Sequence, residues 1–234
     1  MTTHSDERLN KLLAFHMGTS RRQADALIER GAVEINKETA RLGARVKPND
    51  LITVDKKPLI RKQAYTYILL HKPTGYVCSR RQQGNIPTIY SLLPASYHAL
   101  KPVGRLDANS SGLLLLSDDG DFAYRMTHPK FRKQKRYLVT LDHDLEPLHQ
   151  QMISDFGIQL EDGLSQMSLE RQEDGNRKKW IVYMSEGRNR QVRRTFAALG
   201  YTVTKLHRTH FGDYTLDGLS RGQSMPIQTP TSLK

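Results

Sequence analysis

The sequence predicts an α+β protein with two domains, a small amino-terminal one and a larger one that mixes strands and helices. The chain has 234 residues, whereas single domains most often have roughly 100–150, so two units are expected. Hydrophobic residues make up 37% of the chain, enough to fill hydrophobic cores and too little for a membrane protein. We expect the domains to cover residues 1–60 and 61–234.

The first domain reads as two helices followed by short strands. In RLNKLLAFHM, residues 8–17, leucines recur at helical spacing, and Gly18 follows as a C-terminal cap would. Ser20 takes the N-cap position before RRQADALIER, and Gly31 ends that second helix. AVEIN and DLITVD then alternate apolar and polar residues, which is typical of half-buried strands.

The larger domain begins after a basic stretch, KKPLIRKQA at residues 56–64, which we interpret as a linker. Strand-like segments follow in YTYILLHK, GYVCS, GLLLL, RYLVTLD, SLERQ and KWIVYM. Helical spacing appears near residues 117–127, 145–155 and 190–199. This mixture predicts a second domain of the α+β class.

The charge of the chain indicates a polyanionic partner. Lys and Arg number 36 against 24 Asp and Glu, which gives a net charge of +12, as in many nucleic-acid-binding domains. Arg21 and Arg22 fall in the first turn of the second helix, where the helix dipole disfavours cations. We expect them to bind an external anion, and the alternative is a solvated charged face.

The composition also predicts a cytoplasmic protein without membrane contact. A lone cysteine, Cys78, excludes an internal disulfide. MTTHSDERLNK lacks the order of a secretion signal, and no apolar run approaches the roughly 20 residues that span a bilayer. His128, His207 and His210 match no strong zinc pattern, so no metal site is expected.

The stretch VGRLDANSSGLLLLSDDG places an acid, Asp107, on a turn just before four leucines. The leucine run is short enough for a strand that is buried on both faces. A carboxylate held at the mouth of such a strand has a fixed position and reduced solvation, which suits catalysis. The alternative is that Asp107 caps the turn and Arg105 is a surface charge.

A second basic element, NRQVRRTFAALG, is predicted to be a helix that Asn189 caps and Gly200 ends. Arg193 lies on the flank of its apolar stripe, from which a guanidinium can reach a partly buried acid. Arg190 and Arg194 lie opposite the stripe and are expected to face outward, toward phosphates. The alternative is an ordinary basic surface helix.

The segment RMTHPKFRKQKRY, residues 125–137, holds six Lys and Arg and no acid. Such a run repels itself unless an anion neutralises it. With Phe131 and Tyr137 interleaved, it suits contacts to an RNA backbone together with a stacking ring. The alternative for Tyr137 is a core aromatic at the start of a strand.

These motifs resemble a known family. Residues 6–55 resemble the S4 RNA-binding module, through RLNKLLA, SRRQADALIERGAVEIN and VKPNDLITVD. GRLDANSSGLLLLSDDG, together with KQKRYLV and EGRNRQVRR, is similar to the signature of the RsuA-type pseudouridine synthases of bacterial ribosomal RNA. The resemblance covers nearly the whole chain. It implies an S4 domain of the α-L type, then a synthase domain with a mixed, mainly antiparallel sheet flanked by helices.

The resemblance also implies the roles of single residues. Asp107 corresponds to the essential acid, Arg193 to its partner, and Tyr137 to the ring that lies against the target base. In the implied reaction the N1–C1′ bond of a uridine breaks, the uracil turns, and C5 bonds to C1′, without a metal or redox cofactor. The acid serves as a nucleophile at C1′ or a base at C2′, and the sequence leaves both routes open. The cations expected to contact RNA are Arg21, Arg22, Arg105, Lys130, Arg132, Lys133, Lys135, Arg136, Arg188, Arg190 and Arg194.

The leading hypothesis is therefore isomerisation of uridine in ribosomal RNA, with 16S slightly favoured over 23S, by a monomer that needs no cofactor. Its substrate is ribosomal RNA or a ribosome-assembly intermediate. One alternative is a non-catalytic RNA-binding or ribosome-assembly protein built on the S4 module. Another is a synthase that acts on a different RNA, such as transfer RNA.

Overall fold

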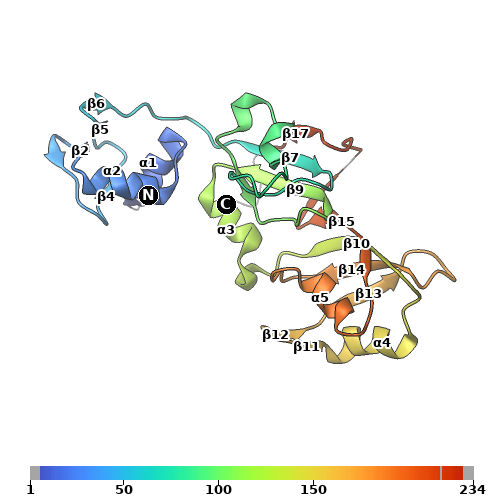
Figure 1. Cartoon of the computed structure of the whole chain (residues 1–234). Coiled ribbons are helices and arrows are strands. Elements are labelled where there is room, and N and C mark those ends of the chain that lie inside the picture. Colours follow the sequence, from blue (N-terminus) through green and yellow to red (C-terminus); the bar gives the residue numbers. More distant parts are fainter. Residues whose placement is uncertain (1–5, 217, 229–234) are drawn as a thin grey trace. The chain divides into compact units, whose positions relative to one another are not determined.

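The computed structural model describes residues 6–216 and 218–228 and divides the chain into two compact units after Thr66 (Figure 1). This division lies a few residues beyond the limit expected at residue 60. Residues 1–5, on which part of the expectation about a secretion signal rests, lie outside the described residues. Within the described residues, no helix is long and apolar enough to cross a membrane.

The first unit contains the predicted helical pair. Helix α1 ends at Gly18, whose φ of 68° is the left-handed conformation that glycine adopts without strain. Ser20 caps α2 and exchanges hydrogen bonds with Gln23 in a capping box, which confirms the predicted start of this helix. The elements are α1 (Leu9–Met17), α2 (Arg21–Glu29), β1 (Glu7–Arg8), β2 (Val33–Ile35), β3 (Glu38–Thr39), β4 (Arg45–Val46), β5 (Ile52–Val54) and β6 (Lys57–Pro58).

The strands of this unit form a small sheet in the order β3-β2-β5-β6 and a separate β1-β4 pair. The helices and strands enclose one cluster of buried apolar residues, which includes Leu9, Leu13 and Ile28. Part of the predicted linker is therefore strand, because Lys57 and Pro58 pair with β5.

The second unit holds the remaining elements. They are β7 (Tyr67–Lys72), β8 (Lys101–Val103), β9 (Ser111–Ser117), α3 (Gly120–Thr127), β10 (Lys135–Leu141), α4 (Pro147–Gln151), β11 (Ile158–Leu160), β12 (Gly163–Ser165), β13 (Ser168–Arg171), β14 (Lys179–Met184), α5 (Gln191–Ala197), β15 (Val203–Phe211), β16 (Tyr214–Thr215) and β17 (Ser224–Pro226). Short 3-10 helices cover Ile89–Leu92, Ala95–Tyr97 and Pro129–Phe131, and a π-helical turn covers Met152–Phe156.

A nine-stranded sheet organises this unit, with the order β13-β14-β10-β15-β9-β7-β17, while β16 pairs with β15 and β8 with β9. Strands β9 and β15 run parallel, and the other strand pairs of this sheet in the described part of the chain are antiparallel. The expected mixed, mainly antiparallel sheet is therefore confirmed.

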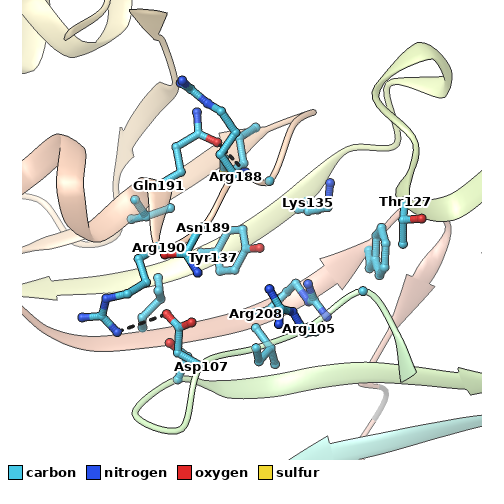
Figure 2. Close-up of a pocket in the computed structure, with 18 residues that line it drawn as sticks. Arg105, Asp107, Thr127, Lys135, Tyr137, Arg188, Asn189, Arg190, Gln191 and Arg208 are labelled. Carbon is cyan, nitrogen blue, oxygen red and sulfur yellow. Dashed lines mark hydrogen bonds and ion pairs between the residues drawn. The ribbon is translucent and has the colours of Figure 1, made fainter. Parts of the chain in front are cut away.

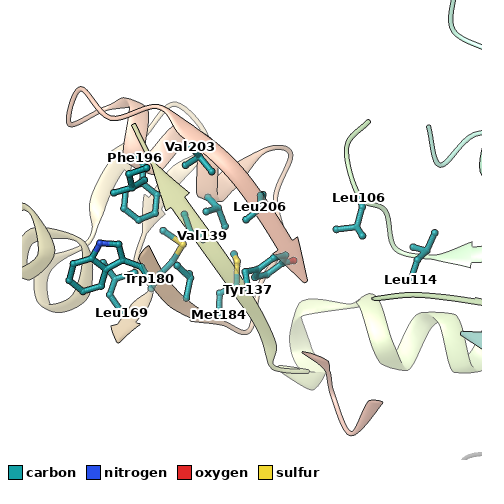
Figure 3. Packing of buried hydrophobic residues seen from close by; sticks show 14 of the residues in the cluster. Leu106, Leu114, Tyr137, Val139, Leu169, Trp180, Met184, Phe196, Val203 and Leu206 are labelled. Atoms are coloured by element: carbon teal, nitrogen blue, oxygen red, sulfur yellow. The ribbon is translucent and has the colours of Figure 1, made fainter. Parts of the chain in front are cut away.

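The four leucines of β9 are buried on both faces of the sheet, as predicted. Leu113 and Leu115 belong to one apolar cluster, whereas Leu114 and Leu116 belong to another, and all four are 0% exposed. This alternation follows from the pleat of a strand. Each such leucine contributes about 1.5–3 kcal/mol by leaving water. The larger cluster extends along β10, β13 and β14 (Figure 3).

Gly112 permits the parallel contact between β9 and β15. Its φ is 111°, and a Cβ atom at this position would lie 2.2 Å from the carbonyl oxygen of Arg208. Only glycine allows the two backbones to approach this closely. This approach brings β15 against the strand that follows Asp107.

One expectation about the elements was wrong, and one strand was not predicted. GYVCS forms an isolated bridge at Val77 instead of a strand. Strand β15, the central neighbour of β9 and β10, was not predicted, because Lys205, His207 and Arg208 interrupt its apolar pattern.

Candidate active site

Asp107 lies on the turn between β8 and β9, and a buried lysine holds that turn in place. The Lys72 ammonium is 0% exposed and donates hydrogen bonds to the carbonyl oxygens of Pro73, Asp107 and Ser110 at 3.0, 3.0 and 2.8 Å. Burial lowers the pKa of Lys72 to about 8. Two of these charge-assisted hydrogen bonds therefore hold the turn of the acid, at Asp107 and Ser110, and the third joins this turn to Pro73 after β7.

The Asp107 side chain enters a cavity of about 240 Å³ (Figure 2). The turn before β9, the start of β10, the loop before α5 and the end of β15 form its walls. Asp107 is the only acidic side chain that lines the cavity among the residues that the structure describes. The lining residues are Gly104, Arg105, Leu106, Asp107, Ser110, Thr127, Lys135, Tyr137, Met184, Gly187, Arg188, Asn189, Arg190, Gln191, Val192, Leu206, Arg208 and Phe211.

Arg190 forms the ion pair with Asp107, with 3.4 Å between Nη1 and Oδ2. This pair was predicted for Arg193, with Arg190 on the outer face of a helix capped by Asn189. Helix α5 instead begins at Gln191, and Arg190 is its N-cap residue with a left-handed φ of 47°. Arg190 therefore leaves the helical register and extends toward the acid.

The Arg193 side chain supports the turn that carries Asp107. Its Nη2 donates to the Asn109 carbonyl oxygen at 2.9 Å and to the Ser110 hydroxyl at 3.5 Å, and its Nη1 donates to the Val203 carbonyl. Burial, and after it the charge of Arg190, lowers the pKa of Arg193, and the charge of Asp107 opposes this shift. Arg193 thus lies within electrostatic reach of the acid without a direct ion pair.

Tyr137 lines the cavity from β10 and is 7% exposed. The same ring belongs to the larger apolar cluster (Figure 3). Tyr137 is therefore a core aromatic that also lines the cavity, and its contact with a base stays a prediction. A flat, mostly buried ring beside a carboxylate suits a planar heterocycle next to a sugar.

The comparisons with known proteins fit this geometry. A family model described as RNA pseudouridylate synthase matches residues 66–198, and an S4 domain model matches residues 7–52. The chain belongs to the RNA pseudouridylate synthase family. The expected S4 domain followed by a synthase domain is thereby confirmed.

Two curated relatives match the chain over nearly their whole length. The chain is 35% identical over 224 residues to a ribosomal small subunit pseudouridine synthase A of Yersinia pestis, with 95% of each chain covered. It is 34% identical over 233 residues to a ribosomal large subunit pseudouridine synthase B of Bacillus subtilis, with 97% of this chain and 94% of the relative covered. A solved pseudouridylate synthase structure shares 34% identity and a TM-score of 0.66 over 95% of this chain and 96% of that one.

The basic tract of the synthase divides into exposed and buried cations. Lys130 and Arg132 are exposed, and Lys133 is half-buried. Lys135 is 7% exposed and donates to the carbonyl oxygens of Ser185 and Glu186 at 3.4 and 3.1 Å. Lys135, which was expected to contact RNA, is buried in the wall of the cavity instead of lying on the exposed part of the tract, and its contact with RNA stays a prediction.

Two further cations expected to contact RNA bind an acid of the synthase itself. Arg188 and Arg194 lie 2.9 and 2.7 Å from the Asp162 carboxylate. Arg188 also donates to carbonyl oxygens of the β11-β12 hairpin. These arginines therefore tie the hairpin to α5 and its preceding loop, which the sequence spacing did not reveal.

The remaining predicted cations have different surroundings. Arg21, Arg22 and Arg105 are exposed. Arg136 is half-buried, with its Cζ 5.8 Å from the centre of the Tyr183 ring.

Two buried cations of the site, Lys72 and Arg208, were not predicted from the sequence. Lys72 carried a weak signal, since a lysine at the end of the apolar run YILLHK is unusual for a buried strand. Arg208 carried none, because the strand that places it was not predicted. Among the described residues, no group of three or more His, Cys, Asp or Glu side chains is placed to hold a metal ion.

Proposed function

We propose that the chain isomerises uridine to pseudouridine within ribosomal RNA, with Asp107 as the catalytic carboxylate. The observation that carries this proposal is the placement of one acid in a cavity lined by several cations and an aromatic ring. The Arg190 guanidinium lies 3.4 Å from this carboxylate and complements its negative charge. An ionised acid is what either attack at C1′ or removal of the C2′ proton requires.

The other side chains have complementary roles in this proposal. Tyr137 stacks on the uracil and guides its rotation after the N1–C1′ bond breaks. Arg193 positions the Asp107 turn through Asn109 and Ser110. The product contains the same atoms as the substrate at the same oxidation level, so the proposed reaction consumes no co-substrate. The proposed enzyme acts as a monomer without a cofactor.

The choice of RNA rests on the relatives. They include small-subunit synthases at 35–39% identity and large-subunit synthases at 34–36%. We propose ribosomal RNA, or an assembly intermediate that contains it, as the substrate and favour 16S slightly. The exposed Arg21 and Arg22 of the S4 unit add affinity for the RNA backbone.

The test incubates the purified full chain with separate pools of 16S transcript, 23S transcript, ribosome-assembly intermediates and transfer RNA. Pseudouridine is read by carbodiimide treatment and primer extension. The proposal predicts one or a few discrete stops in ribosomal RNA or its assembly intermediates. Conversion of transfer RNA alone would reassign the substrate, and RNA binding without conversion of any pool would support the non-catalytic alternative.

A further inference from the structure

Three cationic side chains line the part of the cavity that the proposed chemistry leaves unused. Arg105 precedes Asp107 on the turn, Lys135 begins β10, and Arg208 lies on β15. In Figure 2 these side chains lie on one side of Asp107, and Arg190 lies on the other. The cavity therefore has an acidic centre with an ion pair on one side and a group of cations on the opposite side.

Arg208 is the most constrained of the three. It is 2% exposed, and its Nε donates to the Leu113 carbonyl oxygen at 2.9 Å. Its Cζ lies 4.8 Å from the centre of the Phe211 ring. Its Nη2 is buried without any hydrogen-bond partner. A buried guanidinium nitrogen without an acceptor is costly, which points to a ligand that supplies one.

Lys135 reinforces this charge. Its Nζ lies 5.2 Å from the centre of the same Phe211 ring. Burial lowers the pKa of Lys135 to about 8, and the charge of Arg208 is the next cause. Two like charges are thus held close together in a largely buried place.

The acids in the described part of the chain make no ion pair with these cations, although the charge of Glu186 partly opposes the lowering of the pKa of Lys135. Asp107 pairs with Arg190 at 3.4 Å. The Glu186 carboxylate accepts hydrogen bonds from Arg188 and Gln191. The group formed by Arg105, Lys135 and Arg208, hereafter the cation group, therefore lacks a matching anion among the cavity's own side chains.

We propose that the cation group binds one backbone phosphate adjacent to the target uridine, with Arg208 as its central contact. This inference rests on the proposed function, since it names the part of the RNA that the same cavity holds. A phosphate offers several acceptor oxygens and a full negative charge, so it can bind cations that come from three separate elements. A neutral uracil carbonyl offers one acceptor and leaves most of the charge unbalanced.

Binding a phosphate at this point fixes the register of the RNA. The group holds the backbone next to the target nucleotide, while Asp107 and Tyr137 contact its sugar and base. The cation group then contributes through orientation of the ribose as well as through affinity.

The experiment replaces single phosphates of the RNA by neutral methylphosphonates. The full chain acts on three RNAs with the same target sequence, which carry no replacement, a replacement 5′ of the target uridine, or a replacement 3′ of it. We expect kcat/KM to fall about tenfold or more for one of the two replacements, as the loss of a charge-assisted contact implies. Equal rates on all three RNAs would overturn the inference.

Variants identify the protein partner of that phosphate. Arg208→Lys is expected to lower kcat/KM on the unmodified RNA. On the sensitive methylphosphonate RNA, the kcat/KM of this variant should fall only a little further. Arg105→Gln, an exposed change that spares the core, should also reduce the effect of the methylphosphonate on kcat/KM, but less than Arg208→Lys does. Arg171→Lys, on the exposed end of β13, is the matched control and should retain the full methylphosphonate effect.

The remaining outcomes are also decisive. One outcome is that the methylphosphonate lowers kcat/KM by the same factor in Arg208→Lys, in Arg105→Gln and in the native chain. In that case the phosphate binds elsewhere and the inference fails. A loss in Arg208→Lys that is equal on all RNAs, with no linkage effect in the native chain, would assign Arg208 to the uracil instead. Absence of conversion of the unmodified RNA would overturn the proposed function together with this inference.

Discussion

The two units of the chain use their positive charge in different ways. In the amino-terminal unit, Arg21 and Arg22 are exposed at the start of α2. In the catalytic unit, Lys72, Lys135 and Arg208 are between 0% and 7% exposed. Exposed cations attract a polyanion over a distance and are screened by salt, whereas buried cations fix groups in one geometry. We therefore expect positive charge to supply affinity in the amino-terminal unit and to position the reacting groups in the catalytic unit.

The largest effect is expected at the acid that the buried cations surround. Asp107→Asn removes the negative charge and keeps the shape, so kcat should fall by about a thousandfold or more while RNA affinity is unchanged. Single-turnover conversion and a filter-binding assay measure the two quantities. Asp174→Asn, at an exposed turn, is the matched control. Substantial activity in Asp107→Asn would remove the acid from the chemistry.

The next comparison separates the two arginines around Asp107. Arg193→Ala should lower kcat by about 10- to 100-fold, because the Asp107 turn loses the hydrogen bonds that the guanidinium donates to Asn109 and Ser110. Arg190→Ala should cost less, since its ion pair is partly exposed and solvent screens it. Pre-steady-state rates at saturating RNA provide the comparison. A larger loss in Arg190→Ala would make the direct ion pair the more important contact.

A similar but smaller loss is expected at Lys72. Lys72→Met keeps the length of the side chain and leaves three carbonyl oxygens without their donor, so kcat should fall about tenfold. Unchanged kcat in a folded Lys72→Met variant would show that the turn keeps its position without the lysine.

The same residue predicts a dependence of stability on pH. The pKa of Lys72 is about 8 in the folded chain, against about 10.4 when unfolded. Between these values the unfolded chain binds more protons, so this residue's contribution to the free energy of unfolding rises with pH. Urea unfolding of the native chain relative to Lys72→Met should show this rise above pH 8. A flat difference would contradict the depressed pKa.

The smallest effect is expected in the amino-terminal unit. Arg21→Gln combined with Arg22→Gln should raise KM a few-fold, leave kcat unchanged, and reduce the salt dependence of RNA binding by about one or two in slope. Binding titrations at several salt concentrations measure this slope. A fall in kcat would mean that the exposed cations also position the substrate, which would erase the contrast between the units.

Much of the fold could be predicted because the local patterns and the packing agree. Three local patterns each favour one structure. Gly18 ends a helix, Ser20 caps the next one, and the leucine run forms the buried strand β9. Strand β15 could not be predicted, since its polar residues face the cavity and neighbouring strands that only the folded chain brings together. Its pairing with β9 also depends on Gly112, whose role appears only when Arg208 lies against it.

The site was harder to predict than the fold. The turn that carries Asp107 was recognisable from the residues around it. The ion-pair partner of Asp107 could not be predicted in the same way. Helix α5 begins at Gln191, later than expected, so Arg190 lies before the helix and reaches the acid. Lys72 and Arg208 come from strands distant in sequence, and their burial is a property of the assembled sheet.

We propose that this chain forms pseudouridine in ribosomal RNA through Asp107. This is tested by mapping pseudouridines across 16S and 23S RNA in cells that lack the chain and carry either the native gene or the Asp107→Asn variant. We expect the native gene to restore at least one discrete pseudouridine and the variant, expressed at the same level, to restore none. Restoration of the same pseudouridine by Asp107→Asn would contradict this proposal.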